Sequence, residues 1–193
     1  MIISLERFGV VPAWALDFKK QLYQSLSVLP RGCVYRKLYT PTMQGQDHLL
    51  LECWVTPQCL RTAKQKSALS LPPEAFAATT KLEVYRMTDH LPPVHEKATL
   101  TLHHLWSDRL EFRLQVPGLA VGQHWLLPQK QQQPKAILTF WREPMPLLAR
   151  TLYRQALIGI KYELEVYKPY LPRMARKTRL TLEQDNPQAL AAD

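Results

Sequence analysis

The residues best suited to chemistry are cations and aromatic rings that alternate near the C-terminal end of the chain. Residues 141–180 carry nine Lys or Arg and three Asp or Glu, a balance of +6. Cations neutralise phosphates, and rings such as Trp141, Tyr153, Tyr167 and Tyr170 offer stacking surfaces to unpaired bases. The predicted nucleic-acid-binding residues are therefore Arg142, Arg150, Arg154, Lys168, Arg173, Arg176, Lys177 and Arg179. The plainer alternative, which we weigh equally, is that the rings pack in the core and the cations only solvate a surface.

Two carboxylates form a second candidate. Glu163 and Glu165 lie two residues apart in a segment that alternates apolar and polar residues, so both project from one face of a strand. Such a pair can serve acid–base chemistry in a cleft. It is also the pattern of a solvated face with Lys161 as counter-charge, and exposed charged faces are the commoner case. We therefore expect the solvated face.

The histidines do not have the spacing of a metal site. Metal centres need ligands at fixed intervals, such as HExxH or paired CxxC, and the sequence has neither. Adjacent His103 and His104 point to opposite faces of a strand, so we expect His104 in the core and His103 at the surface. The pair His90 and His95, in one loop, remains a weak alternative for a metal. We expect no metal and no cofactor.

Nucleophilic catalysis has no clear signature either. The sequence has no GxSxG elbow and no glycine-rich phosphate loop. Cys33, Cys53 and Cys59 form no CxxC pair, so we expect structural thiols and a reducing, cytoplasmic setting. The catalytic residues, if the protein is an enzyme, stay unknown at this level.

Composition is that of a folded, basic protein. The formal net charge is +9, and 46% of the residues are apolar, enough for a substantial core. The N-terminus lacks the basic region and apolar run of a signal peptide. No run approaches the roughly 18–20 apolar residues that a membrane-spanning helix needs.

The first half of the chain reads as a β-α-β-β-α-β series, the element order of ferredoxin-like domains. Alternating and apolar runs predict the strands, and helical spacing with proline starts predicts the helices. The predicted strands cover 2–8, 34–39, 48–55 and 81–87, and the predicted helices cover 12–29 and 57–69.

The second half predicts further strands and one helix. Residues 98–116 alternate and predict a hairpin with its turn at 107–109. Strands at 136–141 and 160–167 flank a helix at 146–158. The fold expected is α+β, a two-layer sandwich with a mostly antiparallel sheet, whose N-terminal half is a candidate for the ferredoxin-like arrangement. We expect one domain over 1–182, with 1–88 and 97–182 as alternative halves, and a flexible tail at 183–193.

Three functions fit these features, and no family resemblance helps to choose. The first is a basic cytoplasmic nucleic-acid-associated protein that prefers single-stranded RNA or DNA. The second is a non-catalytic subunit or assembly factor of a larger complex. The third is a small-molecule enzyme with its pocket on the concave face of the sheet, using Glu163 or Glu165 and an arginine. The +6 balance makes nucleic acid the first choice.

Overall fold

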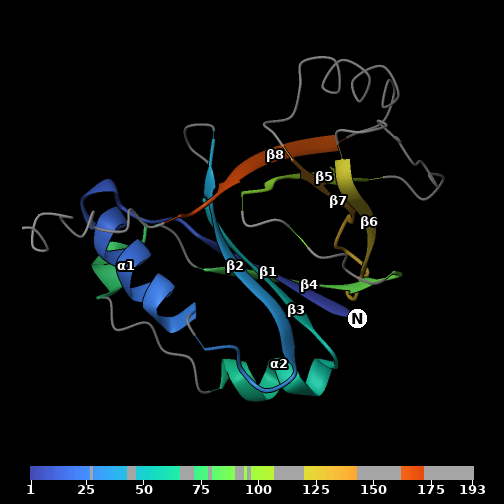
Figure 1. Cartoon of the computed structure of the whole chain (residues 1–193), viewed down its shortest axis with the longest axis horizontal. Coiled ribbons are helices and arrows are strands. Elements are labelled where there is room, and N and C mark those ends of the chain that lie inside the picture. The colour runs from blue at the N-terminus through green and yellow to red at the C-terminus, as the bar shows by residue number, and fades with distance from the viewer. Residues whose placement is uncertain are drawn as a thin grey trace, which may run out of the picture.

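The computed structural model describes residues 1–26, 28–42, 47–65, 72–77, 80–89, 94, 97–106, 120–142 and 162–171. Strands dominate the described residues, and two α-helices lie in the first half of the chain (Figure 1). The elements are β1 (Ile2–Phe8), α1 (Ala15–Leu26), β2 (Cys33–Pro41), β3 (His48–Trp54), α2 (Pro57–Lys64), β4 (Lys81–Met87), β5 (Thr99–Leu105), β6 (Ala120–Pro128), β7 (Lys135–Trp141) and β8 (Tyr162–Pro169).

The strands form a closed antiparallel barrel in the order β1-β3-β2-β8-β5-β7-β6-β4. The expected α+β two-layer sandwich is therefore wrong. The first four strands pair in the order β4-β1-β3-β2. The two outer strands of this group also pair with strands from the second half of the chain, β2 with β8 and β4 with β6. Closure satisfies the backbone groups that a sheet edge would leave unpaired.

The two halves of the barrel repeat one pattern of pairing. β1 lies between β3 and β4, just as β5 lies between β7 and β8. Each seam between the halves is a ladder of three residue pairs, β2 with β8 and β4 with β6. The irregularity in β2 between Cys33 and Tyr35 has its counterpart in β6 between Ala120 and Gly122. The barrel therefore has a pseudo-twofold axis along its length, although the sequence shows no repeat.

The inside of the barrel is packed with side chains. Leu5, Leu51, Leu102 and Leu138 are fully buried members of one apolar cluster, and Tyr85 belongs to it as well. These side chains occupy alternate positions of their strands, as residues on one face of a strand do. The interior is thus a core, and a ligand site is to be sought at the ends or at the seams of the barrel.

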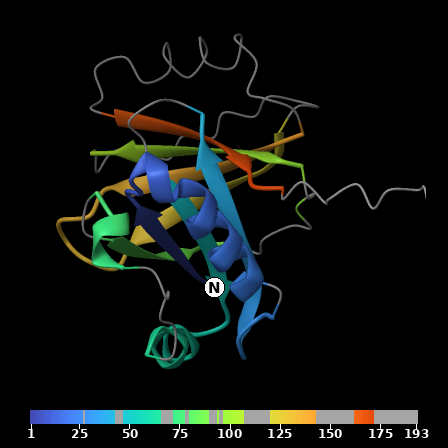
Figure 2. The same cartoon turned by 90° about the vertical axis from the view of Figure 1, so that its left-hand side faces the viewer.

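The two helices cover the outside of the first half (Figures 1 and 2). Phe18 and Leu22 of α1 pack on Phe8, Leu38 and Leu50 of the strands. Leu60 of α2 packs in a separate cluster with Ile2, Cys33 and Trp54. Thr56 caps α2 by accepting a hydrogen bond from the backbone N–H of Cys59 at 3.2 Å. Helix α1 therefore packs on the outer face of β1, β2 and β3. The strand residues that contact it alternate along the chain with those that point into the barrel.

Most predicted elements of the first half are confirmed, with small changes at their ends. The strands 2–8 and 81–87 match β1 and β4 residue for residue. The hairpin at 98–116 is wrong in its pairing, because β5 pairs with β7 and β8. Its second arm, its turn and the predicted helix at 146–158 lie outside the described residues.

Candidate functional site

Four charged or titratable side chains meet at one end of the barrel. Arg7 comes near the end of β1 and His104 near the end of β5, while Glu83 and Glu165 come near the starts of β4 and β8. In antiparallel neighbours these ends coincide, and the position of each residue in its strand aims it inward. All four side chains are buried, at 4–8% exposure. An apolar interior thus ends in a polar cluster.

Arg7 holds the cluster together. Its Nη1 lies 2.7 Å from Oε2 of Glu83, and its Nη2 lies 3.0 Å from Oε2 of Glu165. The same Nη2 lies 2.9 Å from Nε2 of His104. One guanidinium therefore joins strands from both halves of the chain, which suits the planar fork of an arginine.

Two tyrosines complete the carboxylate contacts. Tyr167 donates its hydroxyl to Oε2 of Glu165 at 2.8 Å, and Tyr85 donates to Oε2 of Glu83 at 3.3 Å. Burial raises the pKa of both phenols, and the neighbouring carboxylates raise it further. The tyrosines therefore stay protonated and act as donors.

The charges of Arg7, Glu83 and Glu165 are fixed by their mutual contacts. Burial alone favours the neutral acid of Glu165, but a hydrogen bond from His104 in its protonated form, together with the charge of Arg7, outweighs burial and holds the pKa of Glu165 at about 2. The pKa of Glu83 is also lowered, because Arg7 and Lys81 outweigh the effect of its burial. Burial opposes the charge of Arg7, yet Glu165 and Glu83 raise its pKa. Arg7 is thus a cation beside two carboxylates.

His104 has a defined tautomer in this arrangement. A guanidinium can only donate, so Nε2 of His104 accepts the hydrogen bond from Arg7, and the proton of the neutral ring lies on Nδ1. Oε1 of Glu165 lies 3.6 Å from the same Nε2. If Nε2 takes up a proton, this carboxylate is in place to stabilise the imidazolium.

The cluster forms the floor of a pocket of about 280 Å³. Two cations and four carboxylates line it, a formal balance of −2 before His104 is counted. Lys81 at the rim contacts Oε1 of Glu83 at 2.8 Å. The described lining residues are Arg7, Asp47, Lys81, Glu83, His104, Trp106, Pro134, Glu163, Glu165 and Tyr167.

The pocket lies on the pseudo-twofold axis. Arg7 pairs with Lys81 and Leu49 in the first half, and His104 pairs with Glu163 and Ala136 in the second. Arg7 and His104 are therefore equivalent positions, as are Lys81 and Glu163. The same registers make Glu83 equivalent to Glu165, and Tyr85 equivalent to Tyr167. Of these four pairs of equivalent positions, two carry the same residue type, glutamate or tyrosine, and the other two carry different residue types.

The sequence-based candidates fare unevenly. Of the eight predicted nucleic-acid-binding cations, Arg142 and Lys168 lie in the described residues, and both are exposed and outside this pocket. The other six, Arg150, Arg154, Arg173, Arg176, Lys177 and Arg179, lie outside the described residues.

The acidic pair and the histidine pair are partly corrected. Glu163 is exposed, as expected of a solvated face, but Glu165 on the same face is buried against Arg7. His104 is buried as predicted, whereas the expected surface position of His103 is wrong, because that side chain is fully buried as well. The solvated-face interpretation failed because the strand runs from the rim of the pocket into the barrel.

Sequence reasoning missed Arg7 altogether. The signal available was the stripe Ile3, Leu5, Arg7, in which two apolar residues of one strand face are followed by a cation. The stripe Leu100, Leu102, His104 repeats it. Each series of inward-facing residues ends in a polar side chain, which indicates that one end of the core is polar. The two series do not show that Arg7 and His104 lie close together in the fold.

Neither a metal centre nor a membrane-spanning helix is found in the described part of the chain. No three His, Cys, Asp or Glu side chains gather there in a way that could hold a metal ion. No helix among those residues is long and apolar enough to cross a membrane.

Comparison with known proteins gives a fold and no sequence relatives. No protein-family model matches the sequence, and no curated protein matches it. A candidate monooxygenase of Fusobacterium nucleatum superposes with a TM-score of 0.62 at 7% identity, over 87% of this chain and 91% of that one.

Two further solved structures share the fold. A candidate monooxygenase of Lactobacillus acidophilus gives a TM-score of 0.52 at 7% identity, over 87% of this chain and 93% of the other. An anthrone oxidase-like protein gives a TM-score of 0.60 at 12% identity, over 88% and 91% of the two chains. At such identities the likeness establishes the fold alone.

The nucleic-acid interpretation of the sequence is corrected by these findings, and so is that of a non-catalytic subunit. The fold is shared with two proteins named as candidate monooxygenases and one named as anthrone oxidase-like. The basic balance of residues 141–180 misled the prediction because net charge speaks to solubility and non-specific attraction, and leaves the task open.

Proposed function

We propose that the chain is a small-molecule enzyme whose reaction centre is the pocket at the end of the barrel, with His104 as the group that exchanges a proton with the substrate. The observation that carries the proposal is the 2.9 Å contact between Arg7 and Nε2 of His104, on the floor of a pocket of about 280 Å³. Imidazole can both accept and donate a proton through its ring nitrogens, which makes it the side chain of this cluster best suited to general acid–base work.

The proton step uses the groups around the ring. A substrate that enters the pocket and displaces the Arg7 contact frees Nε2 to take a proton from a substrate N–H, O–H or acidic C–H bond. The bonding pair stays on the substrate, and the imidazolium is stabilised by Glu165, whose Oε1 lies 3.6 Å from Nε2. Arg7, already charged, is available to the electron-rich substrate group.

The charge of the pocket favours one class of substrate. Carboxylates outnumber cations four to two among the described lining residues. A small polar molecule that donates hydrogen bonds or carries a positive charge suits such a lining. The names of the structural neighbours, monooxygenase and anthrone oxidase-like protein, make oxidation the first reaction class to test. Loss of a proton makes a substrate electron-rich, which prepares it for an oxidant.

Oxygen uptake with a panel of amines, phenols and enolisable ketones tests the proposal. Turnover by His104→Ala should fall by roughly 10²–10⁴-fold. His124→Ala is the matched control, because His124 is also buried in a strand but does not line this pocket. An equal loss in both variants would contradict the proposal. Nitrogen-15 NMR gives a readout that needs no substrate: a resting His104 with its proton on Nε2 would contradict the assigned tautomer.

A reducing, cytoplasmic compartment is part of the same proposal. All three cysteines are free thiols, which supports a reducing, cytoplasmic compartment. Burial raises the pKa of Cys33 to about 11, so this thiol is held in its unreactive protonated form.

A further inference from the structure

The mouth of the pocket described above carries side chains that its floor does not use. The four charged or titratable residues of the floor are held in contacts with one another. Asp47, Glu163 and Trp106 line the same pocket but lie outside that hydrogen-bonded cluster. Glu163 and Trp106 are exposed and Asp47 is half-buried, so a ligand that enters from solvent meets these side chains first.

The strand order places these side chains on one side of the mouth. Glu163 of β8 pairs directly with His104 of β5. Trp106 follows His104 by two residues, and the centroids of their rings lie 6.3 Å apart. Asp47 comes immediately before β3. Because β3 and β8 are the two neighbours of β2, Asp47 and Glu163 approach the mouth from either side of the end of β2.

The negative charge on this side of the mouth is not balanced by a described cation. The two inner carboxylates share Arg7, and Lys81 contacts one of them at 2.8 Å. No cation among the described residues forms an ion pair with Asp47 or Glu163. The formal balance of −2 in the lining therefore belongs to these two carboxylates, whose combined field attracts a cation.

The indole at the mouth adds a second attraction for positive charge. Trp106 is 42% exposed, and it lines the pocket together with the two carboxylates. An indole face attracts a cation through its quadrupole, and carboxylates accept the hydrogen bonds of an ammonium group. Ring and carboxylates together match an organic ammonium ion better than a neutral ligand.

The floor of the pocket has a different preference. Nδ1 of His104 carries the proton of the neutral ring and forms no hydrogen bond with a described residue, although the side chain is only 4% exposed. Buried donors without an acceptor are rare in folded proteins. With the guanidinium of Arg7 beside it, this donor suits an oxygen atom of the ligand.

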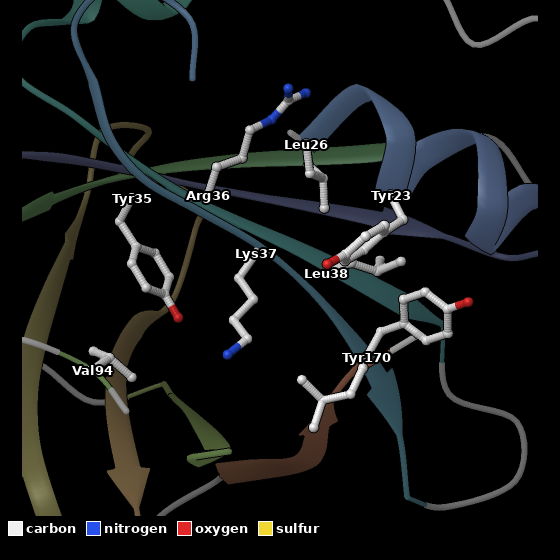
Figure 3. Close-up of a pocket in the computed structure, with 9 residues that line it drawn as sticks. Tyr23, Leu26, Tyr35, Arg36, Lys37, Leu38, Val94 and Tyr170 are labelled. Carbon is white, nitrogen blue, oxygen red and sulfur yellow. The ribbon is translucent and has the colours of Figure 1, made fainter. Parts of the chain in front are cut away.

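A second pocket, at the seam beside β2, provides a comparison within the molecule (Figure 3). It has a volume of about 350 Å³, shares no described lining residue with the first pocket, and has no carboxylate among its described lining residues. Its cations are engaged. Arg36 donates from Nε to Oε1 of Glu52 at 2.7 Å, and Nζ of Lys37 lies 6.0 Å from the ring centroid of Tyr39. An organic cation therefore has reason to choose the first pocket.

We infer that the substrate of the first pocket is an oxygen-bearing amine, with its ammonium group held by Asp47, Glu163 and Trp106 at the mouth and its oxygen directed to the floor. The inference rests on the proposed function, because it takes the floor as the place of reaction. It narrows the substrate from any small polar molecule to a cation. It also makes Glu163 and Trp106 residues that determine specificity.

Four probes built on one benzene ring test the inference. Tyramine carries an ammonium and a hydroxyl group, phenethylamine the ammonium alone, 4-ethylphenol the hydroxyl alone, and 4-hydroxyphenylacetate the hydroxyl with an anion. By isothermal titration, tyramine should bind roughly tenfold more tightly than 4-ethylphenol, and 4-hydroxyphenylacetate should bind most weakly. Phenethylamine should fall between tyramine and 4-ethylphenol. Equal affinities of tyramine and 4-ethylphenol would overturn the inference.

Variants at the mouth test the residues assigned to the ammonium group. Glu163→Gln and Trp106→Leu should each weaken tyramine by roughly fivefold and leave 4-ethylphenol within about twofold, which also shows that the variants are folded. Glu74→Gln, at an exposed carboxylate that does not line the pocket, is the matched control and should leave both affinities unchanged. Unchanged tyramine binding in Glu163→Gln, or an equal loss in Glu74→Gln, would contradict the assignment.

The place of binding can be read on the unmodified protein. In amide NMR spectra, tyramine should shift the signals of residues 47, 104–106 and 163–165. Shifts confined to residues 35–38 and 170–171, at the seam pocket, would overturn the inference.

His104→Ala separates this inference from the proposed function. The variant should lose turnover as proposed above but keep its preference for tyramine over 4-ethylphenol, because the mouth is intact. A wild-type protein that prefers tyramine but turns over no substrate would count against the proposed reaction and leave the cation site standing. Turnover of neutral substrates without any preference for amines would overturn the inference and leave the reaction standing.

Discussion

Glu83 and Glu165 occupy equivalent positions in the two halves of the barrel, and one arginine contacts both. Nη1 of Arg7 lies 2.7 Å from Glu83, and Nη2 lies 3.0 Å from Glu165. The chain brings these carboxylates together from strands far apart in sequence, and burial makes their mutual repulsion costly. The guanidinium therefore closes the end of the barrel as well as forming the floor of the pocket.

Removal of Arg7 should destabilise the protein strongly. Arg7→Met keeps an apolar stem of similar length but leaves two buried carboxylates without their shared cation. Breaking a buried ion pair in this way costs about 3–5 kcal/mol. The free energy of unfolding from urea titrations measures the effect. Arg61→Met, at an exposed arginine of α2, is the control and should change stability by less than about 0.5 kcal/mol. A loss below 1 kcal/mol for Arg7→Met, on the order of an exposed pair, would contradict the buried arrangement.

Glu165 should make stability depend on pH in the acid range. Its pKa falls from 4.5 to about 2 on folding, so the folded state favours the charged form. The resulting stabilisation is complete above pH 4.5 and is lost as the pH falls towards 2. Glu165→Gln should therefore be less stable than the wild type at neutral pH, and its stability should vary less between these two pH values.

The control for this titration is the neighbouring carboxylate. Glu163→Gln, at an exposed position, should retain the wild-type pH dependence. Half-buried His48 and buried His103, whose pKa values are lowered by burial from 6.5 to about 4, destabilise every variant as the pH falls through that range. The difference between variants below pH 4.5 is thus the informative quantity. Parallel curves for Glu165→Gln and the wild type would exclude a lowered pKa.

The first half of the chain should assemble with itself. Residues 1–88 contain β1 to β4 with β2 and β4 at the two edges. Since the seams β2 with β8 and β4 with β6 are equivalent, β2 of one copy can pair with β4 of another and close an eight-stranded barrel. Light scattering after size exclusion should show a dimer with a strand-rich circular dichroism spectrum. A fragment of residues 1–80, without β4, should not dimerise. A folded monomer of residues 1–88 would refute the equivalence of the seams.

Local sequence signals predict the strands well and the closure of the barrel poorly. Ile2 to Phe8 and Lys81 to Met87 carry the residue types and spacing of strands, and they form β1 and β4. Nothing local marks Tyr39 as a partner of Pro169 or Tyr85 as a partner of Pro128. Those pairings depend on how the two half-sheets curve towards each other, which is a property of the whole chain.

The site was harder to predict than the fold for the same reason. A lone Arg7 or Glu165 in a strand reads as one exposed charge of an alternating face. The two residues become members of one buried cluster only because closure brings β1, β4, β5 and β8 to one end. The basic segment after Trp141 gave the stronger pattern in sequence, yet only Arg142 and Lys168 of its candidate cations can be placed, and neither lines the pocket.

The pseudo-twofold axis bears on how such a pocket can evolve. In an assembly of two identical chains, every side chain at the axis appears twice, so an arginine on one side imposes an arginine on the other. Joining the halves in one polypeptide removes that constraint. In a single chain, some pairs of equivalent positions can keep the same residue type, as Glu83 and Glu165 do. Other pairs can differ, as Arg7 differs from His104 and Lys81 from Glu163. A guanidinium and an imidazole can therefore occupy the two equivalent positions that line one pocket, whereas two identical chains would place the same side chain at both.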